Sequence, residues 1–545
     1  MKNIVMLAAV LAAFLGLADE KTVDMLPSEQ WWGMMNYYGT KMPFDASTEL
    51  TMDVRKENHS NQAASFMVSD KGRYLWCDEQ TLVTIKDGKI TMKSDIGTIV
   101  VDDSGKTLQE AFVNASKKHF PSKGKTPDLL FFSAPQYNTW IELTYHQNEK
   151  DILDYAQSML DNGLPPGVLM IDDTWQAGYG DWRFEPTRFS DPKGMMDKLH
   201  AMGYKVILWM CPYVSMDTPA YRRIAWGTNP DDVKGYPTRG GFLGEKSGVV
   251  HGHYKIVDPA AISWWNGKSA FLDFTHPNAN AWFREQLDRL VKDYGADGFK
   301  FDGGHFGSYA QGYITYKKGA TSGEQVMEYA KFALEYPVTE YRNAWRFQGE
   351  PVVERLHDKG HKWSELAKLV PDMIAGGLLG HQFMCPDMVG GGSWTAFIPG
   401  APFDPDLFVR SAQVHALCGM MQFSASPWRY LDKDRQQIIR DLVKMRQSKF
   451  AAYFVELAKE SGRTGEPMIR NLEYNYPGQG YAKISDQFMM GRKLLVAPVV
   501  VKDAVSRKVT LPPGKWVADD GREYVGPTTI EVEAPLSRLP YFECR

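Results

Sequence analysis

The feature that most constrains the fold is a strand–loop–helix rhythm that runs from about residue 129 to about residue 423. Short apolar runs alternate there with helical patterns such as Pro192–Met202 and Ala281–Tyr294. This alternation predicts an α/β fold with a parallel sheet, and a closed (β/α)8 TIM barrel is the form favoured at this length. The expected strands are Leu129–Ser133, Gly167–Ile171, Lys205–Met210, Gly298–Phe301, His381–Cys385 and Met420–Phe423.

Regions with a different pattern flank this segment. Residues 19–124 contain alternating runs such as Thr81–Ile85, separated by Asp-Gly and Ser-Asp turns, which predicts an N-terminal β domain resembling a sandwich. The barrel is expected over residues 125–455, with an irregular insertion at about 217–261 that forms a long loop at the active-site end. Short strands return over residues 456–545, which predicts the end of the barrel and a C-terminal β domain.

The first residues indicate export. Residues 1–18 begin with a lysine after the initiating methionine, continue as an apolar run and end in Gly-Leu-Ala, the pattern of a signal peptide, so we expect a periplasmic or extracellular protein. That run is too short for a membrane span, and no later segment is long and apolar enough to be one. The formal net charge of −4 argues against a nucleic-acid partner. The five cysteines lack metal-ligand or disulfide-framework spacing, and the oligomeric state stays open.

Several of the expected strands end in carboxylates. Asp172 and Asp173 follow one strand, Asp302 follows another, and Asp387 follows a third after a single proline. Each aspartate alone could be a helix cap. Because catalytic side chains of a parallel barrel lie at the carboxyl ends of its strands, the set together predicts a carboxylate-lined pocket.

Four motifs carry a resemblance to a known family. Gly295–Gly304, which reads Gly-Ala-Asp-Gly-Phe-Lys-Phe-Asp-Gly-Gly, resembles the nucleophile segment of glycoside hydrolase family 31. Met170–Trp175, Trp264–Thr275 and Asp486–Pro498 resemble three further motifs of the family and occur in its order. The resemblance covers most of residues 130–515.

The resemblance implies roles for individual residues. Asp302 is expected to be the nucleophile, with Lys300 as a cation near the substrate hydroxyls. Asp172 is expected to bind the outer hydroxyls of the sugar, and Trp265 to pack on the sugar ring. A purely structural ion pair for Lys300 and a core position for Trp265 are the alternatives.

The proton donor is identified by its spacing within the family. The family's donor is followed five residues later by an aromatic residue and preceded 16 residues earlier by an arginine. Asp358 has Trp363 and Arg342 at those positions and lies 29 residues before Asp387, the family's Gly-flanked aspartate. The resemblance implies Asp358 as acid/base, Arg342 as a substrate clamp and Asp387 as a supporting residue of the substrate-binding pocket. Because Leu356–His361 lacks the usual Trp-x-Gly, Asp387 stays the alternative donor.

One departure from the family concerns the sugar. Phe423–Trp428 (Phe-Ser-Ala-Ser-Pro-Trp) stands where most α-glucosidases of the family carry an Arg-x-His segment that holds glucose. With the Lys-x-Asp nucleophile segment, this resembles the branch that contains the myogenesis-regulating glycosidase and bacterial α-galactosidases. The implied function is a retaining, exo-acting α-glycosidase that removes terminal α-galactose from an oligosaccharide or glycoside. It needs no metal or organic cofactor.

Other functions share parts of this pattern. An α-glucosidase, an α-xylosidase or a transglycosylase could use the same barrel and carboxylates. A family 27 or 36 α-galactosidase also has a Lys-x-Asp nucleophile, although Val-Ala-Pro at residues 496–498 favours family 31. A carbohydrate-binding protein without catalysis is the remaining alternative, and the presence of both Asp302 and Asp358 argues against it.

Overall fold

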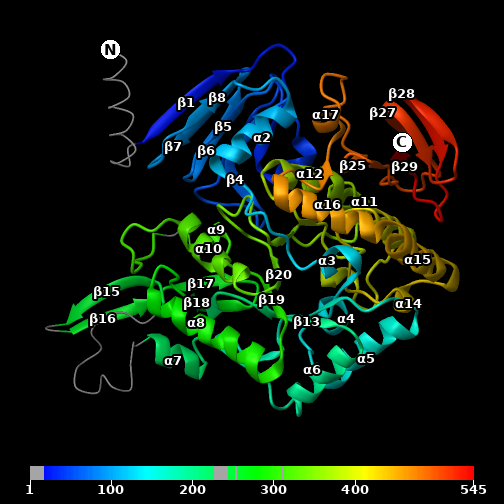
Figure 1. Ribbon diagram of the computed structural model, residues 1–545. Helices are drawn as coiled ribbons and strands as arrows, with labels where there is room; N and C mark the ends of the chain where they lie inside the picture. Colours follow the sequence, from blue (N-terminus) through cyan, green and yellow to red (C-terminus); the bar gives the residue numbers. More distant parts are fainter. Residues whose placement is uncertain (1–17, 226–242, 252–253, 310–311) are drawn as a thin grey trace, which may run out of the picture.

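The structure, a computed structural model, describes residues 18–225, 243–251, 254–309 and 312–545. It confirms a parallel α/β barrel between two flanking β regions (Figure 1). The barrel strands are β9 (Gln136–Asn138), β10 (Val168–Ile171), β13 (Lys205–Met210), β19 (Gly298–Phe301), β20 (Val338–Tyr341), β21 (Val353–Arg355), β22 (Met384–Cys385) and β23 (Gln422–Phe423). They form one sheet in the order β22-β21-β20-β19-β13-β10-β9-β23, and a parallel bridge between Met388 and Gln422 nearly closes it.

Helices surround this sheet on the outside. The longer ones are α5 (Glu149–Asp161), α6 (Pro192–Ala201), α8 (Pro277–Arg289), α10 (Ser322–Ala330), α12 (Leu369–Leu378), α13 (Pro405–Ala416), α15 (Lys433–Met445) and α16 (Ala451–Thr464). Three of them begin directly after an aspartate that accepts a backbone N–H of the first turn: Asp191 before α6, Asp404 before α13 and Asp432 before α15. Such caps satisfy amides that have no partner within the helix.

The strand expected at Leu129–Ser133 was wrong. This segment is the short helix α3 (Leu130–Ser133), and the first barrel strand, β9, follows it. Asp128 explains the difference, because its Oδ1 accepts the N–H of Leu130 at 2.9 Å and starts a helical turn. A four-residue apolar run does not by itself distinguish a buried helix from a strand.

The N-terminal region consists of two antiparallel sheets of four strands each, with α2 (Leu108–His119) packed against β4 and β5. The first sheet contains β1 (Asp19–Asp24), β7 (Lys89–Ser94), β6 (Thr81–Lys86) and β3 (Leu50–Asp53). The second contains β2 (Trp31–Met35), β4 (Ala63–Ser69), β5 (Tyr74–Trp76) and β8 (Val100–Asp102). The predicted signal peptide lies outside the described residues apart from Ala18. Among the described helices, none is long and apolar enough to cross a bilayer.

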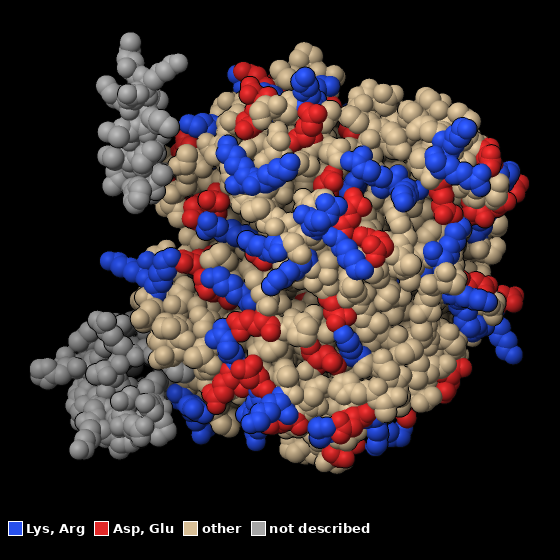
Figure 2. All heavy atoms as spheres, in the orientation of Figure 1, with Lys and Arg blue, Asp and Glu red and all other residues tan. Residues whose placement is uncertain are grey.

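The C-terminal region is one six-stranded antiparallel sheet around its own small core. Its strands are β24 (Ile469–Arg470), β25 (Phe488–Met490), β26 (Leu494–Val496), β29 (Tyr541–Cys544), β27 (Ser506–Ala518) and β28 (Glu523–Glu533). On the face shown in Figure 2, basic and acidic side chains are interspersed over all three regions.

The insertion at about 217–261 is more regular than the sequence predicted. It contains α7 (Pro219–Ala225) and a hairpin of β15 (Glu245–His251) with β16 (Tyr254–Pro259). Residues 226–242 and 252–253 of it lie outside the described part. A second hairpin follows, formed by β17 (Ala261–Trp264) and β18 (Gly267–Phe271). The turn of this second hairpin reaches the pocket described below.

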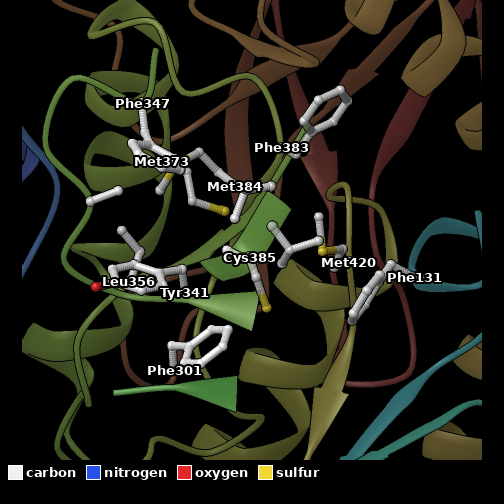
Figure 3. Packing of buried hydrophobic residues seen from close by; sticks show 14 of the residues in the cluster. Phe131, Phe301, Tyr341, Phe347, Leu356, Met373, Phe383, Met384, Cys385 and Met420 are labelled. Carbon is white, nitrogen blue, oxygen red and sulfur yellow. The ribbon is translucent and has the colours of Figure 1, made fainter. Parts of the chain in front are cut away.

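A hydrophobic core fixes the strand ends that carry the site. Phe301 of β19 and Tyr341 of β20 pack with their ring centroids 6.0 Å apart, and Cys385 of β22 lies beside them (Figure 3). All three are buried. Because Phe301 and Tyr341 immediately precede Asp302 and Arg342, packing of the core sets the direction in which those polar side chains leave the strands.

Arg446 secures the barrel wall beside β23. It begins a π-helical turn, η5 (Arg446–Phe450), between α15 and α16, and its side chain is fully buried. Its guanidinium donates to the backbone carbonyls of Phe132, Ala416, Cys418 and Gly419 at 2.7–3.1 Å. One side chain thereby connects α15, α3 and the loop before β23.

Candidate active site

Functional side chains gather at the carboxyl end of the barrel. Asp172, Asp302 and Arg342 directly follow β10, β19 and β20, so they emerge where a parallel barrel carries its site. A pocket of about 330 Å³ opens there. The predicted residues that line it are Asp172, Trp265, Lys300, Asp302, Arg342 and Asp358.

Lys300 and Asp172 form a buried ion pair within this pocket. Lys300 Nζ lies 2.6 Å from Asp172 Oδ2, and each side chain is 4% exposed. The Asp172 backbone N–H donates to Thr139 Oγ1 at 3.0 Å, which fixes the end of β10. Lys300 and Asp172 also border the pocket. Lys300 can therefore form a structural ion pair and still contact the substrate.

Asp302 lies between an arginine and a tryptophan. Its Oδ1 is 3.2 Å from Arg342 Nε, and its Oδ2 accepts the indole N–H of Trp209 at 3.1 Å. Burial of this carboxyl would by itself raise its pKa, but the charges of Arg342 and Lys300 outweigh burial and hold the pKa of Asp302 well below its ordinary value. The carboxylate is thus ionised and oriented, as a nucleophile must be.

Asp358 faces the same arginine from another loop. Its Oδ1 lies 3.3 Å from Arg342 Nη1 and 2.9 Å from Arg355 Nη1. Its side chain is 39% exposed, whereas that of Asp302 is 9% exposed, so Asp358 is the carboxylate that opens toward the pocket. Burial opposes ionisation of Asp358, but the charges of Arg355 and Arg342 prevail and lower its pKa.

Asp387 shares the Nη1 of Arg355 with Asp358. Its Oδ1 is 2.5 Å from Arg355 Nη1, and its Oδ2 accepts the backbone N–H groups of Lys359 and Gly392 at 2.7 and 3.0 Å. The residue is fully buried and has a left-handed φ of +92°, a strained geometry for a non-glycine. Burial raises the pKa of Asp387 to about 6, and the neighbouring charge of Asp358 adds to this.

Three residues of the site received no role in the sequence prediction. Trp209 and Arg355 were not named, and Asp173 was named only among the carboxylates at the strand ends; all three line the pocket. The strand register points to Trp209, because it is paired with Lys300 on the neighbouring strand, and Lys300 is in turn paired with Glu340. Arg355 contacts Glu340, Asp358 and Asp387, so three carboxylates share one guanidinium.

The N-terminal region braces the loops that carry these charges. The side-chain amide of Gln62 donates to the backbone carbonyls of Arg342 and Arg355 at 2.9 and 3.0 Å. Asn61 bonds to both the backbone N–H and the ring Nδ1 of His357, the neighbour of Asp358. Burial, assisted by the charge of Lys359, lowers the pKa of His357 to about 3, so its ring is neutral.

Aromatic side chains border the mouth of the pocket. Trp265 is 45% exposed, so the core position considered for it is excluded, and the Arg342 guanidinium lies 5.9 Å from its ring centroid. Trp140, Tyr145 and Trp394 also line the pocket, with Tyr145 in contact with both tryptophans. Exposed rings of this kind offer flat apolar faces beside buried charges.

A parallel barrel that gathers carboxylates and arginines in a pocket at its strand ends has the two carboxyls that a glycoside hydrolase requires. Comparison with known families agrees: residues 134–449 match the TIM-barrel domain of glycosyl hydrolases family 31, and residues 465–543 match the C-terminal domain of that family. The chain belongs to glycoside hydrolase family 31.

Individual relatives are more distant. The chain is 30% identical over 437 residues to the myogenesis-regulating glycosidase of Mus musculus, covering 78% of this chain and 58% of that protein. It is 24% identical over 511 residues to the alpha-xylosidase XylQ of Lactiplantibacillus pentosus, covering 86% and 60%. The chain thus spans about three fifths of the length of these curated relatives. A solved GH31 alpha-xylosidase from a soil metagenome, complexed with xylose, has the same fold, with a TM-score of 0.77 at 20% identity over 97% of this chain and 79% of that one.

Proposed function

We propose that this protein is an exported, retaining, exo-acting α-glycosidase that hydrolyses terminal α-galactosides. The observation that carries the proposal is the pairing of Asp302 and Asp358 across one guanidinium, with Asp302 buried and ionised and Asp358 open to the pocket. A retaining glycosidase needs two such carboxyls, one to attack the anomeric carbon and one to protonate the departing oxygen. Asp302 takes the first role and Asp358 the second.

The mechanism follows from these positions. Asp302 attacks the anomeric carbon of the α-glycoside while Asp358 gives its proton to the leaving oxygen, which produces a β-linked glycosyl-enzyme. Asp358, now a carboxylate, removes a proton from water, and that water hydrolyses the intermediate with net retention. Lys300 and Asp172 supply a cation and an acceptor for the sugar hydroxyls. Arg342 orients both catalytic carboxylates.

Asp358 shares its proton with a second carboxyl, that of Asp387. Arg355 Nη1 contacts both Asp358 and Asp387, so the two aspartates compete for one proton over the same cation. The groups titrate as a coupled unit rather than separately. The raised pKa of Asp387, about 6, indicates that this unit holds a proton in mildly acidic solution.

The preference for galactose rests on the segment after β23. Here Ser424 Oγ accepts the N–H of Ile141 at 2.8 Å, and the N–H of Ser426 donates to Glu142 at 2.7 Å. Both serines therefore bind α4 (Trp140–Leu143), at the position where most family α-glucosidases hold glucose with Arg-x-His. The absence of that motif from Phe423–Trp428 disfavours glucose and supports galactose.

A panel of nitrophenyl α-glycosides tests the proposal. We expect kcat/KM for the α-galactoside to exceed that for the α-glucoside and α-xyloside by at least about tenfold, the scale of one well-made polar contact. Proton NMR should show α-galactose as the first product. Release of β-galactose first would overturn the retaining mechanism, and a preference for the xyloside, in line with the names of two relatives, would overturn the sugar assignment. Binding of α-galactosides without turnover would identify a carbohydrate-binding protein instead.

A further inference from the structure

The turn between β17 and β18 presents Trp265 to the pocket. Trp264 pairs with Gly267 at the end of the hairpin, so Trp265 and Asn266 form its tip. Trp264 packs edge-on against Tyr179 and Tyr213, each with centroids 4.7 Å apart, whereas Trp265 is 45% exposed. Packing therefore secures the base of the turn, and another contact has to fix its tip.

Asn266 supplies that contact. Its Nδ2 donates to Asp173 Oδ2 at 2.9 Å and lies 2.6 Å from the hydroxyl of Tyr179. The Tyr179 hydroxyl also donates to Asp173 Oδ2, at 3.2 Å. Gln176 Nε2 lies 3.3 Å from the other carboxylate oxygen. One carboxylate, two residues beyond β10, thus receives donors from the barrel loop and from the hairpin tip.

The charge of Asp173 makes this arrangement costly. Its side chain is buried, its partners are the neutral groups of Gln176, Tyr179 and Asn266, and the neighbouring Lys300 pairs with Asp172 instead. Burial first, and then the charge of Asp172, raise the pKa of Asp173 to about 7. A carboxyl held beside another carboxyl is unfavourable for stability, so its contacts are expected to serve another purpose.

We propose that Asp173 is a positioning residue that fastens Asn266 to the end of β10 and thereby holds Trp265 against Arg342, above the two catalytic carboxylates. The chain of contacts is continuous: Asp173 binds Asn266, the adjacent Trp265 lies 5.9 Å from the Arg342 guanidinium, and Arg342 binds Asp302 and Asp358. The consequence for substrate rests on the proposed function, because Trp265 is expected to meet the sugar. The position of the turn does not depend on the proposed function.

Kinetics on the α-galactoside test the consequence for substrate. Asp173→Ala and Asn266→Ala should each raise KM about tenfold with a smaller change in kcat, and the double variant should be no worse than either, because both break one contact. Asp173→Asn should restore most of the affinity, since its amide oxygen can still accept from Asn266. Gln176→Ala is the matched control: it removes a donor from the same carboxylate without touching the turn, and KM should stay within about twofold.

A spectroscopic readout tests the position of Trp265 without catalysis. In protein labelled with 5-fluorotryptophan, the Trp265 fluorine resonance is identified by its loss in Trp265→Phe. It should shift and sharpen in Asp173→Ala and Asn266→Ala, and stay unchanged in Gln176→Ala. An unchanged resonance in both alanine variants would refute the proposal, as would additive KM effects. If the resonance moves as expected but wild-type protein hydrolyses no α-glycoside, the positioning role stands and the proposed function fails.

Discussion

Replacement of Asp387 by asparagine should move the pH dependence of hydrolysis toward acid. Arg355 Nη1 lies 2.9 Å from Asp358 Oδ1 and 2.5 Å from Asp387 Oδ1. The two carboxylate oxygens therefore lie within roughly 5 Å of each other, and each charge opposes ionisation of the other. An asparagine at this position would keep the shape of the side chain and remove that opposition, while Arg342 and Arg355 continue to stabilise ionised Asp358.

The sign follows from which form is active. A proton donor must be protonated in the free enzyme, and Asp358 shares its proton with Asp387, so wild-type kcat/KM should fall as pH rises through the pKa of Asp387, about 6. The nucleophile must be ionised, and since the pKa of Asp302 is well below its ordinary value, no loss is expected from it down to about pH 4. In Asp387→Asn the pKa of Asp358 falls further, so the decline begins at lower pH.

The size of the shift comes from Coulomb's law. At an effective dielectric constant of about 20, unit charges about 5 Å apart interact by about 3 kcal/mol, equivalent to about 2 pKa units. Because 39% of the Asp358 side chain is exposed, solvent screening reduces the expectation to about 1 unit. At neutral pH, kcat/KM should then fall about tenfold relative to wild type.

The assay is kcat/KM from about pH 4 to pH 8 on an α-galactoside with a poor leaving group. A dinitrophenyl α-galactoside is the internal control, since its departure needs little protonation and its profile should barely change. An unmoved or alkaline-shifted decline in Asp387→Asn would refute the coupling through Arg355. Leaving-group dependence with azide rescue in Asp387→Ala would show that Asp387 itself is the acid.

Further outcomes follow from other contacts. Asp302→Asn should abolish turnover by many powers of ten, and more than about a hundredth of wild-type kcat would exclude it as nucleophile. Asp358→Ala should be crippled on a disaccharide but not on an activated aryl glycoside, and added azide should yield a β-galactosyl azide, detectable by NMR; absence of that product would count against the assignment. Gln62→Ala should lower kcat about tenfold and destabilise the fold by about 1–3 kcal/mol, because it leaves two buried loop carbonyls without their donor, and an unaltered kcat would show that the brace is dispensable. Arg446→Met should destabilise the fold by about 3–5 kcal/mol by leaving four buried carbonyls unpaired, and a loss under about 1 kcal/mol in urea unfolding would contradict this.

The barrel was predictable where its strands are uninterruptedly apolar. Lys300 is the one buried charged residue within β10, β13 and β19, and the sequence located these strands. Besides β9, the strands β20 and β21 were missed, because Glu340 and Arg355 place buried charges inside very short segments. Those charged residues belong to the site. Because they interrupt the apolar pattern, the strands that carry them could not be predicted from the sequence.

The residues of the site also divide into those that the sequence could predict and those that it could not. Motifs located Asp172, Trp265, Lys300 and Asp302, and spacing located Arg342 and Asp358; all six line the pocket. Asp387 is fully buried and contacts the pocket residue Arg355, and its expected supporting role stays a prediction, because a spacing argument gives position along the chain but no depth. Arg355 and Gln62 act through bonds to groups far away in sequence, and no local pattern marks such partners.

The contacts of Gln62 make the barrel depend on the N-terminal region, so we expect the two to have evolved together. Its amide holds two loops of a barrel that is encoded hundreds of positions downstream, so neither part is an interchangeable module. Recombination that attached this barrel to a foreign N-terminal domain would inherit the strands and the carboxylates but not the anchor for Arg342. Lineages that kept catalysis should therefore have passed both domains on as a single unit, and engineered chimeras should graft the loop around Gln62 along with the barrel.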